Sequence, residues 1–440
     1  MKRRLYVETW GCQMNRHQSE GIAGLFRDAG YALVDSLSDA DVVLFNGCMV
    51  RQKAEEKVYG RVGAVVEEKR SRPVLLGIGG CLGEIRRNEL LARFPAVDFV
   101  FGARGQQQLP GLIAPLLEEG TRDVLSSEEI GFSDIPFERE STVSAMVTIT
   151  EGCSNYCSYC VVPYARGEMR SRPKPAILSE VRQAVETGYR EILLLGQNVN
   201  SYGTDLAAGG GFVELLDEVA ALGPDRIRFT SSHPRDLTVE VLETMAAHEN
   251  IAPHLHVACQ SGSDRVLRAM NRGYTRDGFL EIVRSGRDIV PGLNMTTDLI
   301  VGFPGETNED FEDTMDLIER ARFGSIFAAM YSPRPGTASA LMDDDVSDAE
   351  KSRRLHRVLD RQREIALAQN EQFVGGEVEV LLEGRTRSGA WFGRAADHRT
   401  VVAETIEGAC AAGDLVRVRI DGATAASLAG AALVPVGGKR

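Results

Sequence analysis

Short apolar runs alternate with amphipathic stretches along the first hundred residues. Three strands are predicted from these runs, at residues 4–11, 41–46 and 73–80. Between them, Ile22, Leu25 and Phe26 share one face of a helix that Gly30 ends, and residues 53–70 form a second helical pattern. Strands that alternate with helices indicate a parallel sheet covered on both faces. We therefore predict an N-terminal, doubly wound α/β domain over residues 1–135.

The same alternation restarts after a polar connector at residues 126–141 and recurs six times. The six strands are predicted at residues 145–149, 191–195, 226–230, 254–258, 294–301 and 325–330. Eight such units close a β/α barrel, so six predict a partial barrel, which we place at residues 136–372. Polar, glycine-rich loops follow the strands, at the edge where such barrels carry their chemistry. An open side would suit a substrate too large for a closed barrel.

The pattern changes to short strands and turns near residue 375. Strands are predicted at residues 377–384, 389–395, 400–405 and 414–420. They indicate a small antiparallel β-barrel of OB-like type over residues 373–440, a fold that often binds nucleic acid. Residues 371–440 hold eight Lys and Arg against nine Asp and Glu, which gives that function little support. A barrel that only stabilises the chain is the alternative.

Six of the eight cysteines fall into two sets of three. Residues 153–160 (CSNYCSYC), here called the cysteine loop, carry Cys153, Cys157 and Cys160. Cys12, Cys48 and Cys81, here called the dispersed triad, each follow a predicted strand of the N-terminal domain. Parallel strands deliver their carboxyl ends to one edge of a sheet, so these three thiols can converge. Cysteine is also a common small buried residue, but the same position after three successive strands favours metal ligands.

Composition places the chain among ordinary globular proteins and restricts its partners. Its 440 residues are 26% charged and 43% hydrophobic, and no apolar run has the length of a signal peptide or a membrane span. We therefore predict a cytoplasmic protein with no membrane partner, in which cysteines are ligands or catalytic thiols more often than disulfides. The net charge of -13 argues against a generally basic nucleic-acid binder. Any RNA site must be a local patch.

The cysteine loop lacks a fourth protein ligand. A zinc site would add another Cys or His nearby, and residues 161–175 contain neither. Clusters of the 4Fe-4S type are normally held by four cysteines, so three thiolates leave one iron open. An open iron can bind S-adenosylmethionine and pass it an electron, after which the cofactor supplies a radical. A disulfide and half of a zinc site are the alternatives.

The motifs resemble those of one enzyme family. The cysteine loop is similar to the radical S-adenosylmethionine signature, with Tyr159 at the aromatic position before the last cysteine. The segments GCQMN, VVPYARGEMRSR, GQNVNSYG, SSHPRD, QSGSDRVLRAMNRGYTR, VGFPGET and YSPRPGT resemble the methylthiotransferase family, in its tRNA-modifying branch of the MiaB type. The resemblance covers nearly the whole chain. It implies an N-terminal methylthiotransferase domain, a radical S-adenosylmethionine partial barrel and a C-terminal TRAM domain.

The resemblance also implies a reaction. The cysteine loop would hold a reducing 4Fe-4S cluster, and the dispersed triad would hold a second, auxiliary 4Fe-4S cluster. Two S-adenosylmethionine molecules would be used per turnover, one to methylate sulfur and one to form a 5'-deoxyadenosyl radical. The implied product carries a methylthio group on carbon 2 of N6-isopentenyladenosine at tRNA position 37, next to the anticodon. The catalytic chemistry would belong to the clusters and the cofactor, with no protein acid or base.

Weaker assignments concern cofactor, RNA and protein partners. Candidate S-adenosylmethionine contacts lie in the loops after the strands and in the cysteine loop, at Tyr159, Gln197, Asn198, Ser231, Ser232 and Gly302. Each could instead be a turn or helix-capping residue. Arg166, Arg170 and Arg172 are candidates for contacts to phosphates of the tRNA anticodon stem-loop, or else ordinary surface ion pairs. We also expect an external electron donor such as flavodoxin or ferredoxin, and a monomer.

Two other functions fit parts of the pattern. Sibling enzymes apply the same chemistry to threonylcarbamoyl-adenosine in tRNA or to an aspartate of a ribosomal protein. The segments GCQMN and YSPRPGT favour the isopentenyladenosine branch by resemblance. A non-catalytic iron-sulfur protein that binds RNA or carries electrons is the alternative of another class. It would not cleave S-adenosylmethionine, so formation of 5'-deoxyadenosine distinguishes it from an enzyme.

Overall fold

The computed structural model describes residues 2–50, 52–119, 122–125, 135–207, 209–406 and 410–435. The chain divides into two compact units. The first comprises Met1–Glu140, Thr150–Ala176 and Arg334–Thr337, and the second comprises Ser141–Ile149, Ile177–Pro333 and Ala338–Arg440. Residues 126–134 of the predicted connector lie outside the described residues. The predicted limits of the three domains remain predictions.

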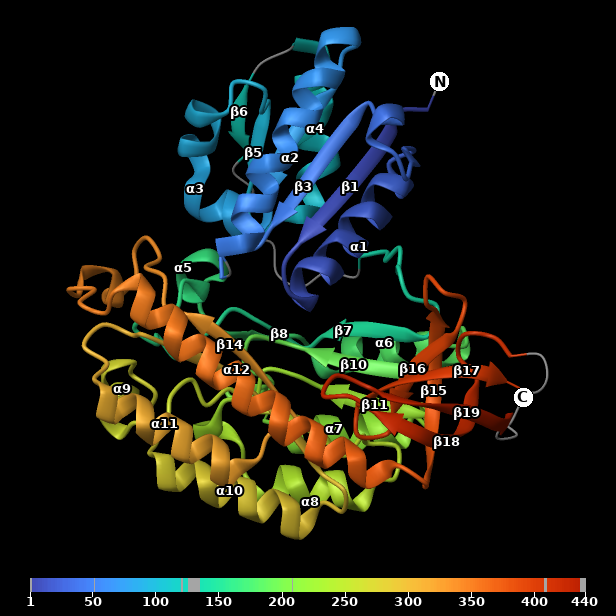
Figure 1. The fold of residues 1–440 in the computed structure, drawn as a ribbon. Coiled ribbons are helices and arrows are strands. Elements are labelled where there is room, and N and C mark those ends of the chain that lie inside the picture. The colour runs from blue at the N-terminus through green and yellow to red at the C-terminus, as the bar shows by residue number, and fades with distance from the viewer. Residues whose placement is uncertain are drawn as a thin grey trace. The chain divides into compact units, whose positions relative to one another are not determined.

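A parallel sheet forms the centre of the first unit (Figure 1). Its order is β2-β1-β3-β4-β5-β6, and every neighbouring pair is parallel. The strands are β1 (Arg4–Trp10), β2 (Ala32–Leu33), β3 (Val42–Gly47), β4 (Leu75–Gly79), β5 (Phe99–Phe101) and β6 (Asp123–Leu125). The three predicted strands correspond to β1, β3 and β4. The strands β2, β5 and β6 have only two or three residues each, and the sequence pattern did not reveal them.

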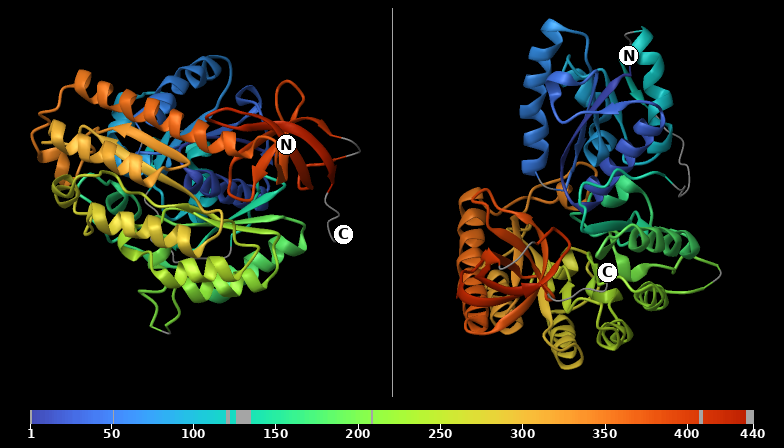
Figure 2. Two further views of the ribbon diagram at one scale, coloured as in Figure 1. Left: turned by 60° about the horizontal axis from the view of Figure 1, so that its bottom comes forward. Right: turned by 90° about the vertical axis from the view of Figure 1, so that its right-hand side faces the viewer.

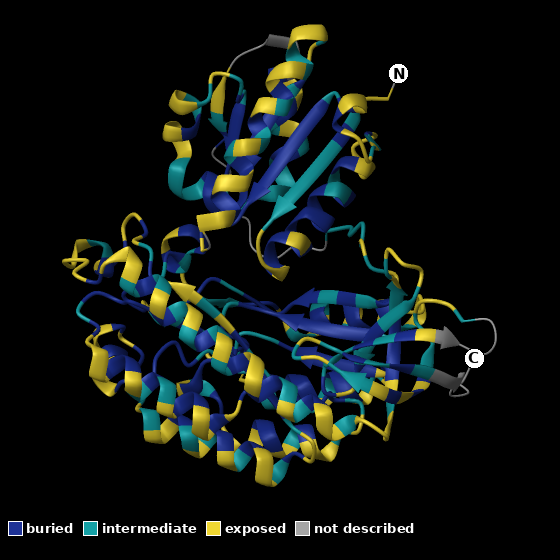
Figure 3. Cartoon of the chain, viewed as in Figure 1, coloured by how far each residue is buried: buried dark blue, intermediate teal, exposed yellow. Residues whose placement is uncertain are grey.

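Helices cover both faces of this sheet, so the doubly wound prediction is confirmed. The helices are α1 (Gln13–Asp28), α2 (Gln52–Ser71), α3 (Gly80–Arg93) and α4 (Leu109–Glu119). Ile22 of α1 and Ile113 of α4 pack in one apolar cluster, whereas Val58 of α2 and Leu82 of α3 pack in another. Figure 3 shows the buried strand β3 beside the partly exposed β1, and helices that carry both buried and exposed positions. The chain reverses direction across the sheet between β1 and β3, which is where ligands bind in folds of this order.

The second unit contains the predicted partial barrel. Its strands are β7 (Ser144–Thr148), β10 (Glu191–Leu195), β11 (Arg226–Phe229), β12 (His254–His256), β13 (Asn294–Val301) and β14 (Ser325–Met330). They form two parallel, three-stranded sheets, β11-β10-β7 and β12-β13-β14, which are joined by the bridges Ile227–Ile251 and Ser232–Val257. All six predicted strands are therefore present, and their carboxyl ends share one edge.

Helices pack against the strands of the partial barrel in one large apolar core. Those that contribute to this core are α6 (Lys174–Glu186), α7 (Phe212–Ala221), α8 (Val239–Ala247), α10 (Arg276–Ile289), α11 (Asn308–Ala321) and α12 (Asp348–Asn370). The short helix α9 (Asp264–Ala269) lies in the same unit. Val358 and Ile365 of α12 are buried in that core. Between β7 and α6 the chain runs through β8 (Thr150–Glu151), α5 (Val162–Arg166) and β9 (Arg170–Ser171).

A small closed barrel ends the described chain (Figure 2). Its strands are β15 (Glu377–Arg385), β16 (Trp391–Ala395), β17 (Thr400–Ile406), β18 (Leu415–Ala423) and β19 (Leu428–Pro435), in the order β15-β16-β17-β19-β18. The sequence pattern predicted four strands and an antiparallel barrel of OB-like type. The fifth strand, β19, is rich in alanine and pairs parallel to β17, so the barrel is mixed.

The small barrel contacts the amino-terminal ends of the large barrel's strands. Arg226 begins β11 and donates through Nη1 to the carbonyl oxygen of Arg394 at 3.0 Å, and Asn294 begins β13 and donates to that of Asp397 at 2.9 Å. Nearby, Arg228 pairs with the buried Glu191 at 2.6 Å. The small barrel therefore packs at the edge opposite the polar loops, which follow the carboxyl ends of the strands.

We expect this contact to make stability depend on pH. The rings of His254 and His398 lie 4.8 Å apart, and burial together with the charge of Arg228 holds the pKa of both below the ordinary value of 6.5. The folded chain keeps both rings neutral, whereas the unfolded chain takes up a proton at each. The contribution of these two histidines to the free energy of unfolding should therefore be constant above pH 7. Below pH 6.5 it should fall by about 1.4 kcal/mol per pH unit for each histidine.

Urea unfolding between pH 7.5 and pH 5 measures this dependence. His398 has a φ of +70°, which asparagine tolerates, so His398→Asn should fold and show a shallower dependence on pH. His356 is exposed on α12, and His356→Asn serves as the matched control with an unchanged dependence. Equal slopes for the two variants would contradict the prediction.

Candidate metal centres and cofactor site

The loops after β1, β3 and β4 bring the dispersed triad together in the first unit. In the sheet, Trp10 pairs with Gly47 and Asn46 pairs with Gly79. Cys48 follows β3 directly, while Cys12 precedes the first residue of α1 and Cys81 lies in the first turn of α3. The three cysteines thus lie just beyond the same edge of the sheet. Cys48 and Cys81 are buried, and Cys12 is exposed.

Glycines allow these loops to touch. A Cβ atom on Gly11 would lie 2.7 Å from the Cβ of Cys48, and one on Gly47 would lie 2.8 Å from the side chain of Leu82. One on Gly80, which has a φ of +76°, would lie 2.2 Å from the side-chain oxygen of Asn46. Any larger residue would push the loops apart. The close approach of the three loops therefore depends on glycine beside each cysteine.

Hydrogen bonds between two buried asparagines connect α1 with the end of β3. Asn15 donates to the side-chain oxygen of Asn46 at 3.0 Å, and Asn46 donates to the backbone oxygen of Asn15 at 3.0 Å. The Cys12 thiol lies 3.3 Å from the Asn15 side-chain oxygen. Neither asparagine was a predicted site residue, although each lies close in sequence to a cysteine of the triad, in GCQMN and NGC.

The three thiols influence one another's ionisation. A hydrogen bond from Cys48, assisted by the charge of Arg166, lowers the pKa of Cys12, and the same contact raises the pKa of Cys48. Burial raises the pKa of Cys81, while the charge of Arg166 opposes that rise. Thiolates are the form that binds metals. Cys12 is the one of these three cysteines whose pKa is lowered, so it loses its proton most readily.

The donor set is of the kind that holds an iron-sulfur cluster. Thiolates on one zinc ion all lie about 2.3 Å from it, and in the described part of the chain no three His, Cys, Asp or Glu side chains form such a group. In a 4Fe-4S cluster each cysteine binds a different iron, so the sulfurs can be more widely spaced. Three soft sulfur donors at one edge, with a buried cation beside them, fit this group.

The cysteine loop also lies in the first unit, and the chain enters it five residues beyond the end of β7. Cys153 and Cys157 are buried, and Cys160 and Tyr159 are partly exposed. Tyr156 has a φ of +45°, unusual for an aromatic residue, and its side chain is 46% exposed. A strained backbone of this kind is common in loops that hold a cofactor.

The three candidate arginines have different surroundings. Arg166 and Arg172 are buried, and Arg170 of β9 is partly exposed. Tyr164 is exposed near them in sequence, as is Tyr156. Arg170 with these two tyrosines offers charge and aromatic faces, which are the usual contacts to single-stranded RNA. Arg166 reaches the dispersed triad instead of solvent.

Unpaired polar atoms gather after β10 and β11 in the second unit. Among the residues that the structure describes, both side-chain polar atoms of Gln197 and Asn200 are buried without a hydrogen-bond partner, as are Asn198 Oδ1, Ser232 Oγ and His233 Nε2. Asn198 also donates to Asp236 at 2.5 Å. Buried polar atoms are normally paired. Their concentration in two neighbouring loops therefore fits a polar ligand such as the amino acid and ribose parts of S-adenosylmethionine.

Backbone conformation marks two further candidates. Ser231 has a φ of +66°, and Gly302 has a φ of +70°. A Cβ atom on Gly302 would lie 2.3 Å from the side chain of Lys351, so a larger residue would force this side chain to move and would strain the backbone. The Gly302 amide donates to Glu306 at 2.6 Å and is therefore already paired. Asn200 and His233 were not among the predicted contacts, because nothing in their spacing distinguishes them from loop residues.

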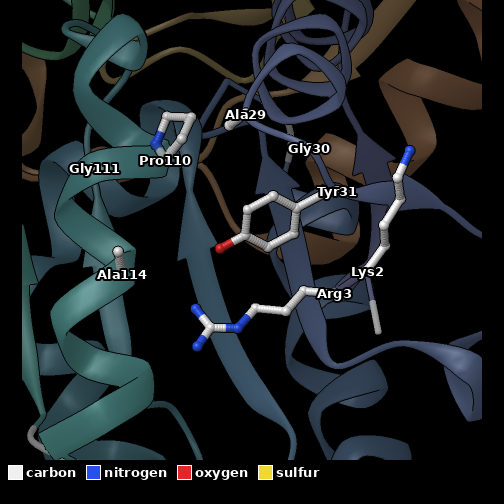
Figure 4. A pocket seen from close by; sticks show the side chains of 8 residues that line it. All are labelled: Lys2, Arg3, Ala29, Gly30, Tyr31, Pro110, Gly111 and Ala114. Carbon is white, nitrogen blue, oxygen red and sulfur yellow. The ribbon is translucent and has the colours of Figure 1, made fainter.

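The first unit has a surface pocket (Figure 4), which lies away from the dispersed triad. Lys2 and Arg3 precede β1, and Tyr31 precedes β2, so these lining residues lie at the amino-terminal end of the strands. The dispersed triad follows the carboxyl-terminal end. This pocket therefore belongs to neither candidate centre.

Comparisons with known proteins agree over most of the chain. Family models match at residues 4–102 (Uncharacterized protein family UPF0004), 147–318 (Radical SAM superfamily) and 371–433 (TRAM domain). A protein of Carboxydothermus hydrogenoformans is 45% identical over 389 residues, which cover 87% of this chain and 88% of the relative. One of Chlorobium luteolum is 44% identical over 437 residues, which cover 97% of each. Both relatives are named tRNA-2-methylthio-N(6)-dimethylallyladenosine synthase.

Solved structures share the fold at low sequence identity. The radical S-adenosylmethionine methyltransferase TsrM from Kitasatospora setae, solved with cobalamin and a 4Fe-4S cluster, is 15% identical with a TM-score of 0.58. The match covers 78% of this chain and 74% of that one. In the described part of this chain, no helix has the length and apolar character needed to cross a membrane.

Proposed function

Since this chain belongs to the family of tRNA-2-methylthio-N(6)-dimethylallyladenosine synthases, we propose that it methylthiolates carbon 2 of N6-isopentenyladenosine in tRNA. The modified base would be at position 37, beside the anticodon. The relatives' printed names, together with the coverage of 97% by one of them, support this proposal. The single structural observation that carries it is the convergence of Cys12, Cys48 and Cys81 at one edge of the N-terminal sheet, because this gives the chain a second sulfur site besides the cysteine loop.

We assign one 4Fe-4S cluster to each cysteine set, for a total of two. Cys153, Cys157 and Cys160 would hold the reducing cluster, and the dispersed triad would hold the auxiliary one. When bound, these groups with S-adenosylmethionine supply a radical that removes hydrogen from carbon 2 and the methylated sulfur that replaces it. A radical would be used because an aromatic C–H group is too weakly acidic for a protein base to remove its proton.

Residues of the chain would bind and orient the cofactor. The unpaired atoms of Gln197, Asn198 and Ser232 can hydrogen-bond its amino, carboxylate and ribose groups. Asn200 and His233 join this set on the same evidence. Tyr159, Ser231 and Gly302 remain candidates through their positions in the cysteine loop and after β11 and β13. A bound ligand would also give hydrogen-bond partners to these buried polar atoms, which are costly to leave unpaired.

RNA would be bound by separate surfaces. The TRAM domain and Arg170, with the exposed Tyr156 and Tyr164, are the candidate contacts to the anticodon stem-loop. Reaction at position 37 requires the base to leave its stack, which aromatic side chains can favour by stacking on it. The external electron donor, the monomeric state and the cytoplasmic location remain predictions.

Mass spectrometry of nucleosides tests the proposal. Reduced, reconstituted enzyme with S-adenosylmethionine and tRNA that carries N6-isopentenyladenosine should convert this nucleoside to its 2-methylthio form. Transcripts with unmodified adenosine at the same position serve as the control. Conversion of threonylcarbamoyl-adenosine tRNA, or of a ribosomal-protein aspartate, in its place would assign the chain to a sibling. Failure to form 5'-deoxyadenosine would favour the non-catalytic alternative.

A further inference from the structure

Arg166 is a buried cation at the dispersed triad. Arg166 is 5% exposed, and its Nη2 has no hydrogen-bond partner among the described residues. Among the charges that act on its guanidinium, that of Cys81 has the largest effect, followed by those of Cys12 and Glu151. In the part of the chain that the structure describes, Arg166 forms no ion pair with a carboxylate. A buried guanidinium requires a negative partner, so the sulfurs are its natural counter-charge.

Packing fixes Arg166 at this place. It ends α5, a five-residue helix that begins two residues after Cys160. Val161 and Ala165 are buried in the same apolar cluster as Cys81 and Leu82. The segment that follows the cysteine loop is therefore part of the core that holds the dispersed triad. Arg166 is the charged residue that this packing brings to the sulfurs.

A second arginine of the first unit gives a contrast. Arg334 is also buried, but it lies 3.7 Å from Glu55 and donates to the backbone oxygen of Val50 at 3.2 Å. Glu55 accepts from Tyr59 at 2.6 Å as well. Arg334 thus has a carboxylate and a carbonyl as partners. The two arginines share burial and charge and differ in what they face.

We propose that Arg166 is a positioning residue of the auxiliary site, whose guanidinium balances the negative charge of the cluster and of the sulfur that the cluster presents. This inference rests on the proposed function. A cluster held by three thiolates carries net negative charge, which increases on reduction. A buried cation in contact with its sulfurs stabilises the reduced form, because net charge and hydrogen bonds to sulfur set the potential of such clusters. In this role Arg166 is not one of the contacts to tRNA phosphates.

The reduction potential of the auxiliary cluster tests this role. The full-length chain with Cys153, Cys157 and Cys160 all changed to Ala keeps only the dispersed triad, so its redox titration, followed by EPR, reports one cluster. Arg166→Gln in this background should shift the midpoint potential to a more negative value. Arg166→Lys, which keeps the charge but not the planar fork, should lie between the two. Arg334→Gln is the matched control and should leave the potential unchanged.

Several outcomes would overturn the inference. An unchanged potential in a folded, loaded Arg166→Gln protein would do so, as would equal shifts for Arg166→Gln and Arg334→Gln, since these would indicate only a general loss of structure. If Arg166→Gln does not fold, pulsed EPR of the unsubstituted background labelled with ¹⁵N-arginine decides: nitrogen coupling to the cluster is expected, and its absence refutes the contact. A background that binds no iron would overturn the proposed function together with this inference.

Discussion

Cys157→Ala should abolish the formation of 5'-deoxyadenosine from S-adenosylmethionine. Cys157 is buried in the middle of the cysteine loop and is one of three proposed ligands to the reducing cluster. Two thiolates are too few to hold that cluster, so the electron that cleaves the cofactor cannot be delivered. Iron should fall from about eight to about four per chain after anaerobic reconstitution. Chromatography of the reduced reaction mixture measures the nucleoside, and a ferrozine assay measures the iron.

Cys410→Ala is the matched control for this variant. It also removes one thiol, but Cys410 lies in the C-terminal barrel, outside both cysteine sets. Its iron content and its yield of 5'-deoxyadenosine should equal those of the unchanged chain. Cofactor cleavage by the Cys157→Ala protein at the rate of the control would show that the cysteine loop does not hold the reducing cluster.

Cys12→Ala should separate the two halves of the reaction. The cysteine loop is intact in this variant, so cofactor cleavage should persist, while transfer of the methylthio group to tRNA should stop. Iron should again fall to about four per chain, now through loss of the auxiliary cluster. Cys12 is the best of the three positions for this test because it is exposed, whereas truncation of the buried Cys48 or Cys81 would also disturb the core.

Two measurements on the same samples decide the result. Mass spectrometry quantifies the methylthiolated nucleoside, and chromatography quantifies 5'-deoxyadenosine. Methylthiolated tRNA at the yield of the Cys410→Ala control would refute a role for the dispersed triad in sulfur transfer. Loss of both products together with thermal destabilisation would indicate misfolding, and Cys12→Ser, which keeps the polarity and nearly the size of the thiol, would then repeat the test.

Regular repetition made most of the fold predictable from the sequence. Each strand of the partial barrel is followed by a polar loop and a helical pattern, so all six were found. The missed strands lack that signal. β2, β5 and β6 are too short for a periodic pattern, and β19 is rich in alanine and glycine, which are uncommon in strands. The parallel pairing of β17 with β19 depends on the path of the chain, which local patterns do not contain.

The candidate site was predictable where spacing carried the chemistry. The cysteines after β1, β3 and β4 were found because parallel strands deliver their ends to one edge. The burial of Arg166 was not predicted, because an arginine in a polar segment is ordinarily exposed and only the packing of Val161 and Ala165 draws it inward. The unpaired atoms of Asn200 and His233 likewise depend on three-dimensional surroundings.

The first unit is assembled from three stretches of chain, Met1–Glu140, Thr150–Ala176 and Arg334–Thr337. A protein shortened to begin at residue 141 would therefore lose most of the core around Val161 and Ala165 and leave Arg166 without its sulfur neighbours. Neither cysteine set can be studied on an excised fragment in its native surroundings. For the same reason, chimeras between relatives should tolerate exchange of the C-terminal barrel, a separate closed sheet, far better than exchange of the first 140 residues.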